Sequence, residues 1–407
     1  MQTWLEKQLL ATRQGREAEK ILRSCVHCGF CNATCPTYQL LGDELDGPRG
    51  RIYLIKQMLE GAAAGRNTQQ HLDRCLTCRS CESTCPSGVE YSRLLDIGRS
   101  ICEQRVKRPL SERQLRWILR KVLPYPRRLG PLLRLSNIVK PLLPKALKQL
   151  IPPFNHSSSS CTSSPANIRH QRQMILLDGC VQSVTNPGIN EATVRVLDRL
   201  GISVIRPDGG GCCGAVSHHL AAHKESVLAM RKNINAWWSA IQNGCEAIIS
   251  SSSACTSMLK AYQSVLSEDV AYADKAREIS SRVRDLSEII DAEDLGRLKL
   301  ETNGMSIAFH ASCSLQHGLQ KKNVVENILE RCGYELTQVR DAHLCCGAGG
   351  TNTILQKSIA RQLLADKLAS LEEGQPALIA TANIGCLLQL QSGTRLPVKH
   401  WIELLEQ

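Results

Sequence analysis

The sequence predicts an α+β multidomain protein in which an N-terminal helical domain precedes two duplicated α/β modules. Three observations favour this class. The length of 407 residues corresponds to two or three domains at about 150 residues each. A short cysteine run occurs twice near the N-terminus, and a longer cysteine pattern occurs twice in the remainder. We expect the helical domain at 1–104, a basic Pro- and Leu-rich segment with a Ser-rich linker at 105–166, and the modules at 167–300 and 301–407.

The composition is typical of a globular chain whose thiols stay reduced. Hydrophobic residues make up 43% and charged residues 22% of the chain. No apolar run approaches the roughly 20 residues of a membrane-spanning helix, and the charged first twenty residues lack a secretory signal. We therefore expect a cytoplasmic location, where 20 cysteines indicate metal binding rather than disulfides.

The first repeat is the run C-x2-C-x2-C-x3-C-P, at 25–36 and again at 75–86. A loop with this spacing brings three thiolates to one side of an iron–sulfur cluster, and the fourth cysteine, held by its proline, points away. In two-cluster ferredoxins that cysteine ligates the other cluster. Structural zinc fits less well, because it uses two C-x2-C pairs at longer separation. We predict a ferredoxin-like domain with two [4Fe–4S] cubane clusters, with Cys25, Cys28, Cys31 and Cys85 as ligands of cluster 1, and Cys75, Cys78, Cys81 and Cys35 as ligands of cluster 2.

The elements between these cysteines follow from periodicity and from helix-end signals. A helix is expected at 47–64, with Pro48 in its first turn, to bring the two runs together. In the modules, apolar runs that end near cysteines predict buried strands, and amphipathic stretches closed by glycine predict helices. The strands are expected at 174–180, 202–207, 246–255, 306–313, 334–339 and 377–386, and the helices at 190–201, 223–241, 323–333 and about 353–372.

The second repeat combines a single cysteine, a Cys-Cys-Gly (CCG) tripeptide and a further cysteine. Its first three positions recur with a shift of 313 − 180 = 133 residues. Strand ends are where open α/β sheets place ligand sites, and a glycine beside vicinal cysteines lets two thiolates face one metal. Buried small side chains or a redox-labile thiol pair are the alternatives. The possible metal ligands are Cys180, Cys212, Cys213 and Cys255 in the first module, and Cys313, Cys345, Cys346 and Cys386 in the second.

Other cofactors find little support in the sequence. Neither glycine run of the CCG segments forms a nucleotide-binding G-x-G-x-x-G that opens a helix and is followed by a ribose-binding acid. We expect no flavin or nicotinamide site and no catalytic residue, so electrons must come from another subunit. His310 and His317 flank Cys313, and His343 precedes Cys345. Structural histidines are more common than ligands, and these three are not assigned to a metal.

A basic segment separates the two cysteine-rich regions. Residues 101–150 contain 13 Lys and Arg against two acids, a net charge of 13 − 2 = +11. The stretch 113–123 has apolar residues at helical spacing, and it could lie on an anionic membrane, contact a partner subunit or simply be solvated. With 3 Phe, 5 Trp and 7 Tyr, the chain has few aromatic side chains on which nucleic-acid bases could stack. This argues against nucleic acid as a partner. The Ser-rich stretch 151–166, with Cys161, is expected to be a linker.

These motifs together resemble a known family. A double C-x2-C-x2-C-x3-C-P domain joined to two CCG modules is similar to the iron–sulfur subunits of glycolate oxidase (glycolate dehydrogenase). The segment CVHCGFCNATCPTYQLLGDELDGPRGRIYLIKQMLEG carries much of this similarity. The resemblance implies that an FAD-containing subunit oxidises glycolate, and possibly D-lactate, to the 2-oxo acid. This chain, not catalytic alone, would then pass the electrons toward a quinone-type acceptor, as a cytoplasmic protein that can contact the inner membrane peripherally.

The resemblance leaves two alternatives open. The chain could serve a related glycerol-3-phosphate or lactate dehydrogenase, or its CCG modules could act as a thiol–disulfide or quinone reductase. In the related heterodisulfide reductase, CCG modules bind non-cubane clusters and end in C-x-x-C. Here Thr256, Ser257 and Met258 follow Cys255, and Leu387, Leu388 and Gln389 follow Cys386. The fifth donor is therefore absent, and we expect at most a four-thiolate cluster in each module.

Overall fold

The computed structural model describes residues 1–139 and 170–406. The chain forms two compact units, of which the first comprises Met1–Trp117, Cys313–Gln320 and Asp341–Ala369, and the second Ile118–Ser312, Lys321–Arg340 and Ser370–Gln407. Parts of the second module thus belong to the same unit as the N-terminal region. The domain boundaries expected from the sequence stay predictions. The expected linker at 151–166, with Cys161, lies outside the described residues.

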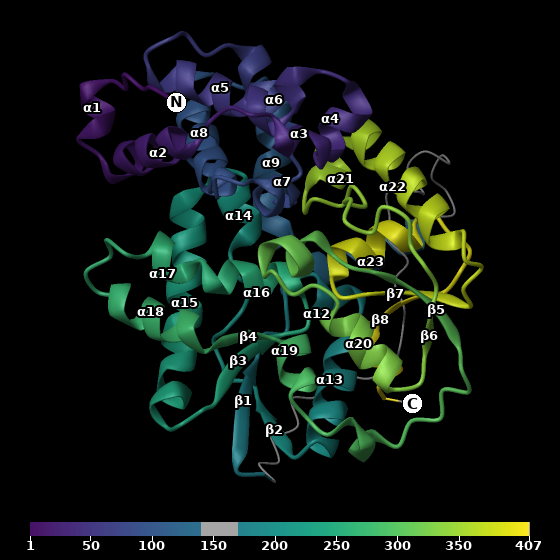
Figure 1. The fold of residues 1–407 in the computed structure, drawn as a ribbon. Coiled ribbons are helices and arrows are strands. Elements are labelled where there is room, and N and C mark those ends of the chain that lie inside the picture. The colour runs from purple at the N-terminus through teal and green to yellow at the C-terminus, as the bar shows by residue number, and fades with distance from the viewer. Residues whose placement is uncertain (140–169, 407) are drawn as a thin grey trace. The chain divides into compact units, whose positions relative to one another are not determined.

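The N-terminal part of the first unit is built from short helices around an apolar core (Figure 1). Leu22, Ile55, Leu94 and Leu95 are fully buried in this core. The helix expected at 47–64 is observed as α5 and begins with Pro48, whose missing N–H costs nothing in a first turn. The helices are α1 (Lys7–Leu10), α2 (Arg13–Ser24), α3 (Phe30–Ala33), α4 (Pro36–Leu41), α5 (Pro48–Leu59), α6 (Arg66–Asp73), α7 (Ser80–Thr84) and α8 (Tyr91–Arg105), with a 3₁₀ turn at Glu44–Asp46.

The second unit contains two four-stranded sheets with the same topology. The first has the order β2-β1-β3-β4 and the second the order β6-β5-β7-β8, and every strand pair is parallel. The expected duplication of an α/β module is therefore confirmed. The strands are β1 (Arg172–Leu176), β2 (Ile202–Ile205), β3 (Ala247–Ser250), β4 (Val283–Asp285), β5 (Ser306–His310), β6 (Glu335–Leu336), β7 (Leu378–Thr381) and β8 (Val398–His400).

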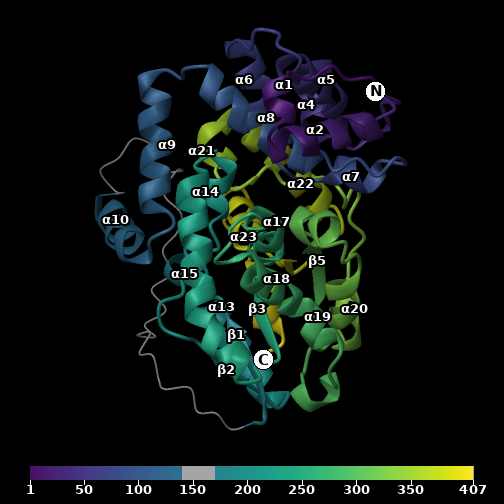
Figure 2. The same cartoon turned by 90° about the vertical axis from the view of Figure 1, so that its left-hand side faces the viewer.

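Helices cover these strands as expected for crossover connections. In the first module, α15 packs Ile234 and Trp237 against Ile175 of β1 and Ile248 of β3. Figure 2 shows α15 along the first sheet. The helices of the first module are α12 (Gln182–Thr185), α13 (Gly188–Arg199), α14 (Ala215–His219), α15 (His223–Gln242), α16 (Ser253–Lys260), α17 (Tyr262–Val265), α18 (Ala273–Arg282) and α19 (Leu286–Asp291). The second module has α20 (Val324–Arg331), α21 (Asn352–Leu355), α22 (Lys357–Glu372) and α23 (Ile384–Gln391).

All six strand predictions extended beyond the observed strand ends. The strands expected to end at Cys255 and Cys386 stop at Ser250 and Thr381, and both cysteines lie in the first turn of the next helix. In the first module, the Ser252 N–H donates to the Ser250 hydroxyl, 3.2 Å away. Such local side-chain hydrogen bonds compete with the strand ladder and favour a helix start, so the polar run ends the strand early.

The basic segment forms α9 (Leu110–Val122) and α10 (Pro126–Val139), which follow one another as separate helices (Figure 2). The first of them includes residues 113–122 of the stretch whose apolar residues have helical spacing. None of the described helices has both the length and the apolar character that crossing a membrane requires.

Candidate metal centres

The first candidate centre is a cavity in the first unit, partly open to solvent. Cys25, Cys28 and Cys31 from the first repeat line it, together with Cys85 and Cys81 from the second repeat, and Cys81 lines the second cavity as well. Burial, followed by the neighbouring thiols Cys25 and Cys85, raises the pKa of Cys31 to about 11. This cavity therefore collects the four cysteines that the sequence assigns to cluster 1.

The second candidate centre is a cavity lined by Cys75, Cys78 and Cys81 with Cys35 from the other repeat. Burial raises the pKa values of Cys78 and Cys81 well above their usual range, and the neighbouring thiols add to this effect. Four thiols enclosed in one cavity favour the binding of a cationic group, because such a group can replace the protons of the thiols. The donor set of each cavity fits a cubane cluster, although ligation itself remains a prediction.

The two cysteine loops share an unusual backbone. His27 and Gly29 have φ values of 60° and 88°, and the equivalent positions Thr77 and Arg79 have φ values of 54° and 62°. A left-handed backbone conformation costs a non-glycine residue roughly 1 kcal/mol or more. Residues in such conformations cluster at functional sites. The same wound loop is thus formed twice from different residues.

A buried ion-pair network lies beside the second cavity. Asp46 is 0% exposed and Arg51, which lines the cavity, is 1% exposed. The Asp46 carboxylate contacts the Arg51 guanidinium at 3.5 Å, His71 Nδ1 at 2.9 Å and the Arg74 guanidinium at 2.6 Å. Arg51 also donates to the hydroxyl of Thr37 at 3.2 Å. Sequence reasoning missed this network, because no local pattern signals partners that come from different helices.

The two cavities differ in exposure. Cys28 is exposed, and Val26 and Phe30 beside it are 68% and 62% exposed. By contrast, all four cysteines of the second cavity are buried. Leu76 and Cys78 belong to an apolar cluster that includes Cys345, Ile359 and Leu363 of the same unit. The first cavity is therefore the more accessible of the two.

The four cysteines of the first module form a connected group. Hydrogen bonds from Cys180 and Cys213 lower the pKa of Cys212 to about 4, and the same contacts raise the pKa values of their donors. The Gly214 N–H also donates to the Cys212 sulfur, 3.4 Å away, and Cys213 interacts with Cys255. This arrangement can hold a thiolate or a thiophilic metal at the carboxyl ends of the strands.

Two side chains hold this CCG loop in place. The Tyr262 hydroxyl donates to the Cys213 carbonyl at 2.9 Å, and Asn233 Nδ2 donates to the Cys212 carbonyl at 3.0 Å. Asn233 Oδ1 accepts from the Gly211 N–H at 2.9 Å. Neither residue was singled out from the sequence, because each lies on a helix far along the chain from the loop that it supports.

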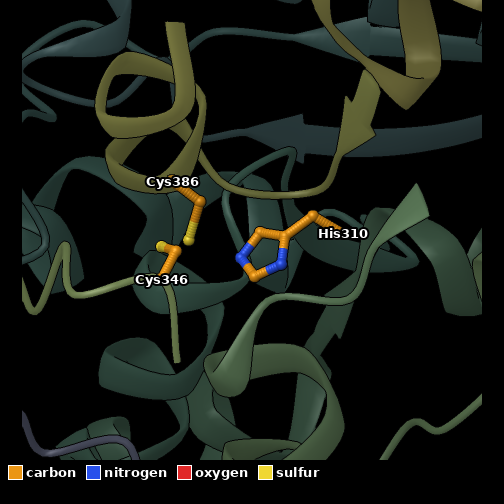
Figure 3. Close-up of side chains that lie close together, drawn as sticks. All are labelled: His310, Cys346 and Cys386. Carbon is orange, nitrogen blue, oxygen red and sulfur yellow. The ribbon is translucent and has the colours of Figure 1, made fainter. Parts of the chain in front are cut away.

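The second module repeats part of this pattern. The Gly347 N–H donates to the Cys345 sulfur at 3.4 Å, as Gly214 does in the first module, and Cys345 exchanges a side-chain hydrogen bond with Cys313. His310 and Cys386, both of the second unit, place their potential ligand atoms within 4.8 Å of one another (Figure 3). His310 is the counterpart of Leu177 in the first module, because the two positions differ by the repeat shift of 310 − 177 = 133 residues. Sequence reasoning noted His310 but did not assign it as a ligand.

His317, also noted from the sequence, has structural contacts at both ring nitrogens. Its Nδ1 lies 3.0 Å from the Ser83 hydroxyl and its Nε2 lies 3.0 Å from the His343 carbonyl. This agrees with the structural role that the sequence favoured for it.

Family models match the cysteine-rich regions. A "4Fe-4S dicluster domain" model matches residues 21–89, and a "Cysteine-rich domain" (CCG) model matches residues 174–260 and 307–391. These matches confirm the predicted iron–sulfur cofactors and the order of a dicluster domain followed by two CCG modules. The dicluster domain makes this an electron-transfer protein.

Similarity to characterised proteins extends over the whole chain. It is 50% identical to the glycolate oxidase iron–sulfur subunit of Escherichia coli (strain K12), over 100% of this chain and 99% of that protein. A probable glycolate oxidase iron–sulfur subunit of Bacillus subtilis (strain 168) is 27% identical over 95% of this chain and 92% of its own length. Lactate utilization protein A of Bacillus licheniformis is 30% identical over 52% of this chain and 87% of its own length. The chain therefore belongs to the family of glycolate oxidase iron–sulfur subunits.

Proposed function

We propose that this chain is the electron-transfer subunit of a flavin-dependent complex that oxidises glycolate, and also D-lactate, to the 2-oxo acid. The observation that carries the proposal is the pair of cysteine-lined cavities, each lined by both repeats, in a chain half identical to a glycolate oxidase iron–sulfur subunit. An FAD-containing subunit performs the oxidation, and this chain conducts the electrons toward a quinone-type acceptor.

Each cavity holds one [4Fe–4S] cluster in this proposal. Cluster 1 is bound by Cys25, Cys28, Cys31 and Cys85, and cluster 2 by Cys75, Cys78, Cys81 and Cys35. Bound clusters would supply one-electron redox chemistry. The lining residues of the two cavities support these sets, and so does the shared backbone of the two loops.

Electrons enter through cluster 1. The exposure of Cys28 supports this direction, and so do the exposed apolar side chains of Val26 and Phe30 beside it. Exposed aromatic and aliphatic side chains next to a redox centre suit the core of a protein interface. We infer that the flavin subunit docks on this surface.

Reconstitution with the flavin subunit tests the function. Glycolate is expected to reduce the clusters of the anaerobic chain only when the flavin subunit is present, as followed by loss of visible absorbance and by EPR. Glycerol 3-phosphate, run in parallel, separates the proposed substrates from that of a related dehydrogenase, and D-lactate tests the second proposed substrate. Glycolate-dependent dye reduction by the purified chain alone would contradict the assignment, and so would preferential reduction by glycerol 3-phosphate.

We also propose that the cysteines of the CCG modules bind further iron–sulfur clusters: Cys180, Cys212, Cys213 and Cys255 in the first module, and Cys313, Cys345, Cys346 and Cys386 in the second. The connected thiols of the first module support a metal, while the lowered pKa of Cys212 also suits a thiol–disulfide reductase. Iron analysis of a Cys212→Ser variant separates the two. A cluster predicts loss of iron relative to the parent protein, whereas a redox thiol predicts unchanged iron and loss of disulfide reduction by the dithionite-reduced chain.

We also propose that the protein is located peripherally on the cytoplasmic face of the inner membrane. Three apolar side chains of α10, Leu132, Leu135 and Ile138, are exposed at helical spacing, and the exposed Arg127 and Arg134 lie on the same helix. Such a helix can bury its apolar face at the boundary of an anionic bilayer. Arg116 and Arg120 of α9 serve less well, because they pair with Asp73 at 3.0 Å and with Glu225 at 3.4 Å.

A further inference from the structure

Tyr91, the first residue of α8, lines both candidate cluster cavities. Its side chain is 4% exposed, and no nitrogen or oxygen atom of the described residues accepts a hydrogen bond from its hydroxyl, which lies instead beside the Cys75 thiol. Other buried tyrosines differ: the Tyr262 hydroxyl donates to the Cys213 carbonyl at 2.9 Å, and the Tyr334 hydroxyl donates to the Leu404 carbonyl at 2.8 Å. Because buried tyrosine hydroxyls usually have a partner, the position of the Tyr91 hydroxyl indicates a sulfur of the cavity as its acceptor.

The surroundings of the hydroxyl point to the second cavity. Tyr91 lines the second cavity together with Cys75 and Arg51, and its hydroxyl has a side-chain contact with the Cys75 thiol. The guanidinium of Arg51, almost completely buried, interacts with the same Tyr91 and Cys75 and with Cys35. A hydrogen-bond donor and a cation thus lie together beside the Cys75 side of this cavity.

We propose that the Tyr91 hydroxyl donates a hydrogen bond to a sulfur of cluster 2, at Cys75 or an adjoining sulfide, and with Arg51 stabilises the reduced state of that cluster. The proposal rests on the cluster assignment made under the proposed function. A reduced cluster carries one more negative charge than the oxidised cluster, so hydrogen bonds to sulfur and a nearby cation raise its reduction potential.

The first cavity has a weaker counterpart. Arg49 lines it, but this arginine pairs with Glu44 at 2.6 Å, and its side chain is 35% exposed. Solvent screens an exposed paired charge far more than a buried one. Tyr91 and Arg51 therefore favour electron transfer from the open first cluster to the enclosed second one, where the electron is held.

A Tyr91→Phe variant tests the proposal in the full-length, anaerobically purified protein. EPR-monitored redox titration with dithionite should show the reduction of cluster 2 to be three- to tenfold less favourable, which is about 30–60 mV at 59 mV per tenfold. The potential of cluster 1 should stay unchanged. The signal that a Cys75→Ser variant loses identifies cluster 2, and the signal that a Cys25→Ser variant loses identifies cluster 1. Tyr334→Phe is the matched control, because it removes a buried hydroxyl that already has a carbonyl partner.

A second readout reports the hydrogen bond itself. Electron–nuclear double resonance of reduced cluster 2 should show an exchangeable proton, detected by comparing H2O with D2O, that is lost in Tyr91→Phe. An unchanged potential of cluster 2 in a variant with full iron and sulfide content would overturn this inference alone. A shift confined to cluster 1 would overturn it as well, while a parent protein without iron and sulfide would overturn both this inference and the proposed function.

Discussion

Cys35 and Cys75 line the same cavity, although they belong to different copies of the cysteine repeat. The relationship is reciprocal, because Cys85 of the second copy lies in the cavity of Cys25. The proline after the fourth cysteine explains the exchange. Pro36 opens α4, so the chain turns away from its own loop directly after Cys35.

Replacing Cys35 should therefore damage the cluster of the other repeat. We expect Cys35→Ser to lose the EPR signal that Cys75→Ser also loses, and to retain the signal that depends on Cys25. Cys85→Ser should have the reverse effect. Cys332→Ser, which changes a cysteine outside both cavities, should leave both signals intact. Selective loss of the Cys25-dependent signal in Cys35→Ser would show that each repeat binds its own cluster.

The backbone of the cysteine loops makes a second prediction. A Cβ added at Gly29, where φ is +88°, would lie 2.6 Å from the Arg49 guanidinium. We expect Gly29→Ala to lower the free energy of unfolding by roughly 1 kcal/mol. At the equivalent position, Arg79→Gly should change the free energy of unfolding by less than about 0.5 kcal/mol. The relief of left-handed strain in the folded state offsets the entropy that glycine adds to the unfolded chain. Thermal and denaturant unfolding measure both, and equal losses in the two variants would contradict the account.

A third prediction concerns pH. His400 is fully buried, its Nε2–H donates to the Ser251 carbonyl at 2.8 Å, and its Nδ1 accepts from the Ile402 N–H at 3.3 Å. Burial lowers the pKa of His400 to about 4, whereas an unfolded histidine titrates near 6.5. The unfolded chain therefore binds the proton first, and stability falls as the pH drops below 6.5.

The size of this effect can be measured by denaturant unfolding. Between pH 7.5 and pH 5.5, His400 should contribute a loss of about 1.3 kcal/mol, calculated from the two pKa values. In His400→Gln that contribution should vanish, so the variant should show a flatter pH dependence while all other titrating groups are common to both proteins. A parallel pH dependence of the two proteins would mean that His400 takes up its proton in the folded state.

The exposed surface around cluster 1 gives a fourth prediction. Phe30→Asp places a charge at the proposed interface without touching a cysteine, because the Phe30 side chain is exposed. The rate at which the glycolate-reduced flavin subunit reduces this chain should fall roughly tenfold, as expected for loss of an interface anchor worth about 1.4 kcal/mol. Leu228→Asp, at an exposed leucine of α15, is the control and should keep the parental rate. The docking surface is elsewhere if stopped-flow rates of Phe30→Asp match those of the control.

The membrane proposal gives a fifth prediction. The triple variant of α10, Leu132→Glu, Leu135→Glu and Ile138→Glu, should no longer co-sediment with vesicles that contain anionic phosphatidylglycerol. The parent protein should bind them, and it should bind pure phosphatidylcholine vesicles less well, because the exposed arginines favour anionic lipid. Leu228→Glu controls for added charge at an exposed leucine. Equal binding of the parent protein and the triple variant would remove α10 as the contact.

Spacing made much of the molecule predictable. The double cysteine run predicted that cysteines of both repeats meet, and both repeats line each cavity, with Cys81 in both. The 133-residue shift predicted two α/β modules, and these have the same sheet order. Both signals are periodic in sequence, because duplication preserved them. The exact strand ends were not predictable: at β3, for example, the Ser252 N–H donates to the Ser250 hydroxyl, a local hydrogen bond that competes with the strand ladder.

The residues around the thiols were less accessible to sequence reasoning. Asp46, Arg51 and Tyr91 come from three separate elements and meet only in the folded chain. The assignment of segments of the second module to the first compact unit depends in the same way on long-range packing, as in the cluster of Cys78, Cys345 and Ile359. Such long-range contacts produce no periodic pattern in a single sequence, so they could not be predicted from it.

The central claim is that this chain binds at least two iron–sulfur clusters through its duplicated cysteine loops and conducts electrons. The iron and acid-labile sulfide content of anaerobically purified protein tests this most directly. The account predicts about eight irons and eight sulfides per chain if only the dicluster domain is occupied, and about twelve or sixteen if one or both CCG modules are also filled. Colourless protein that contains zinc and no acid-labile sulfide would contradict it.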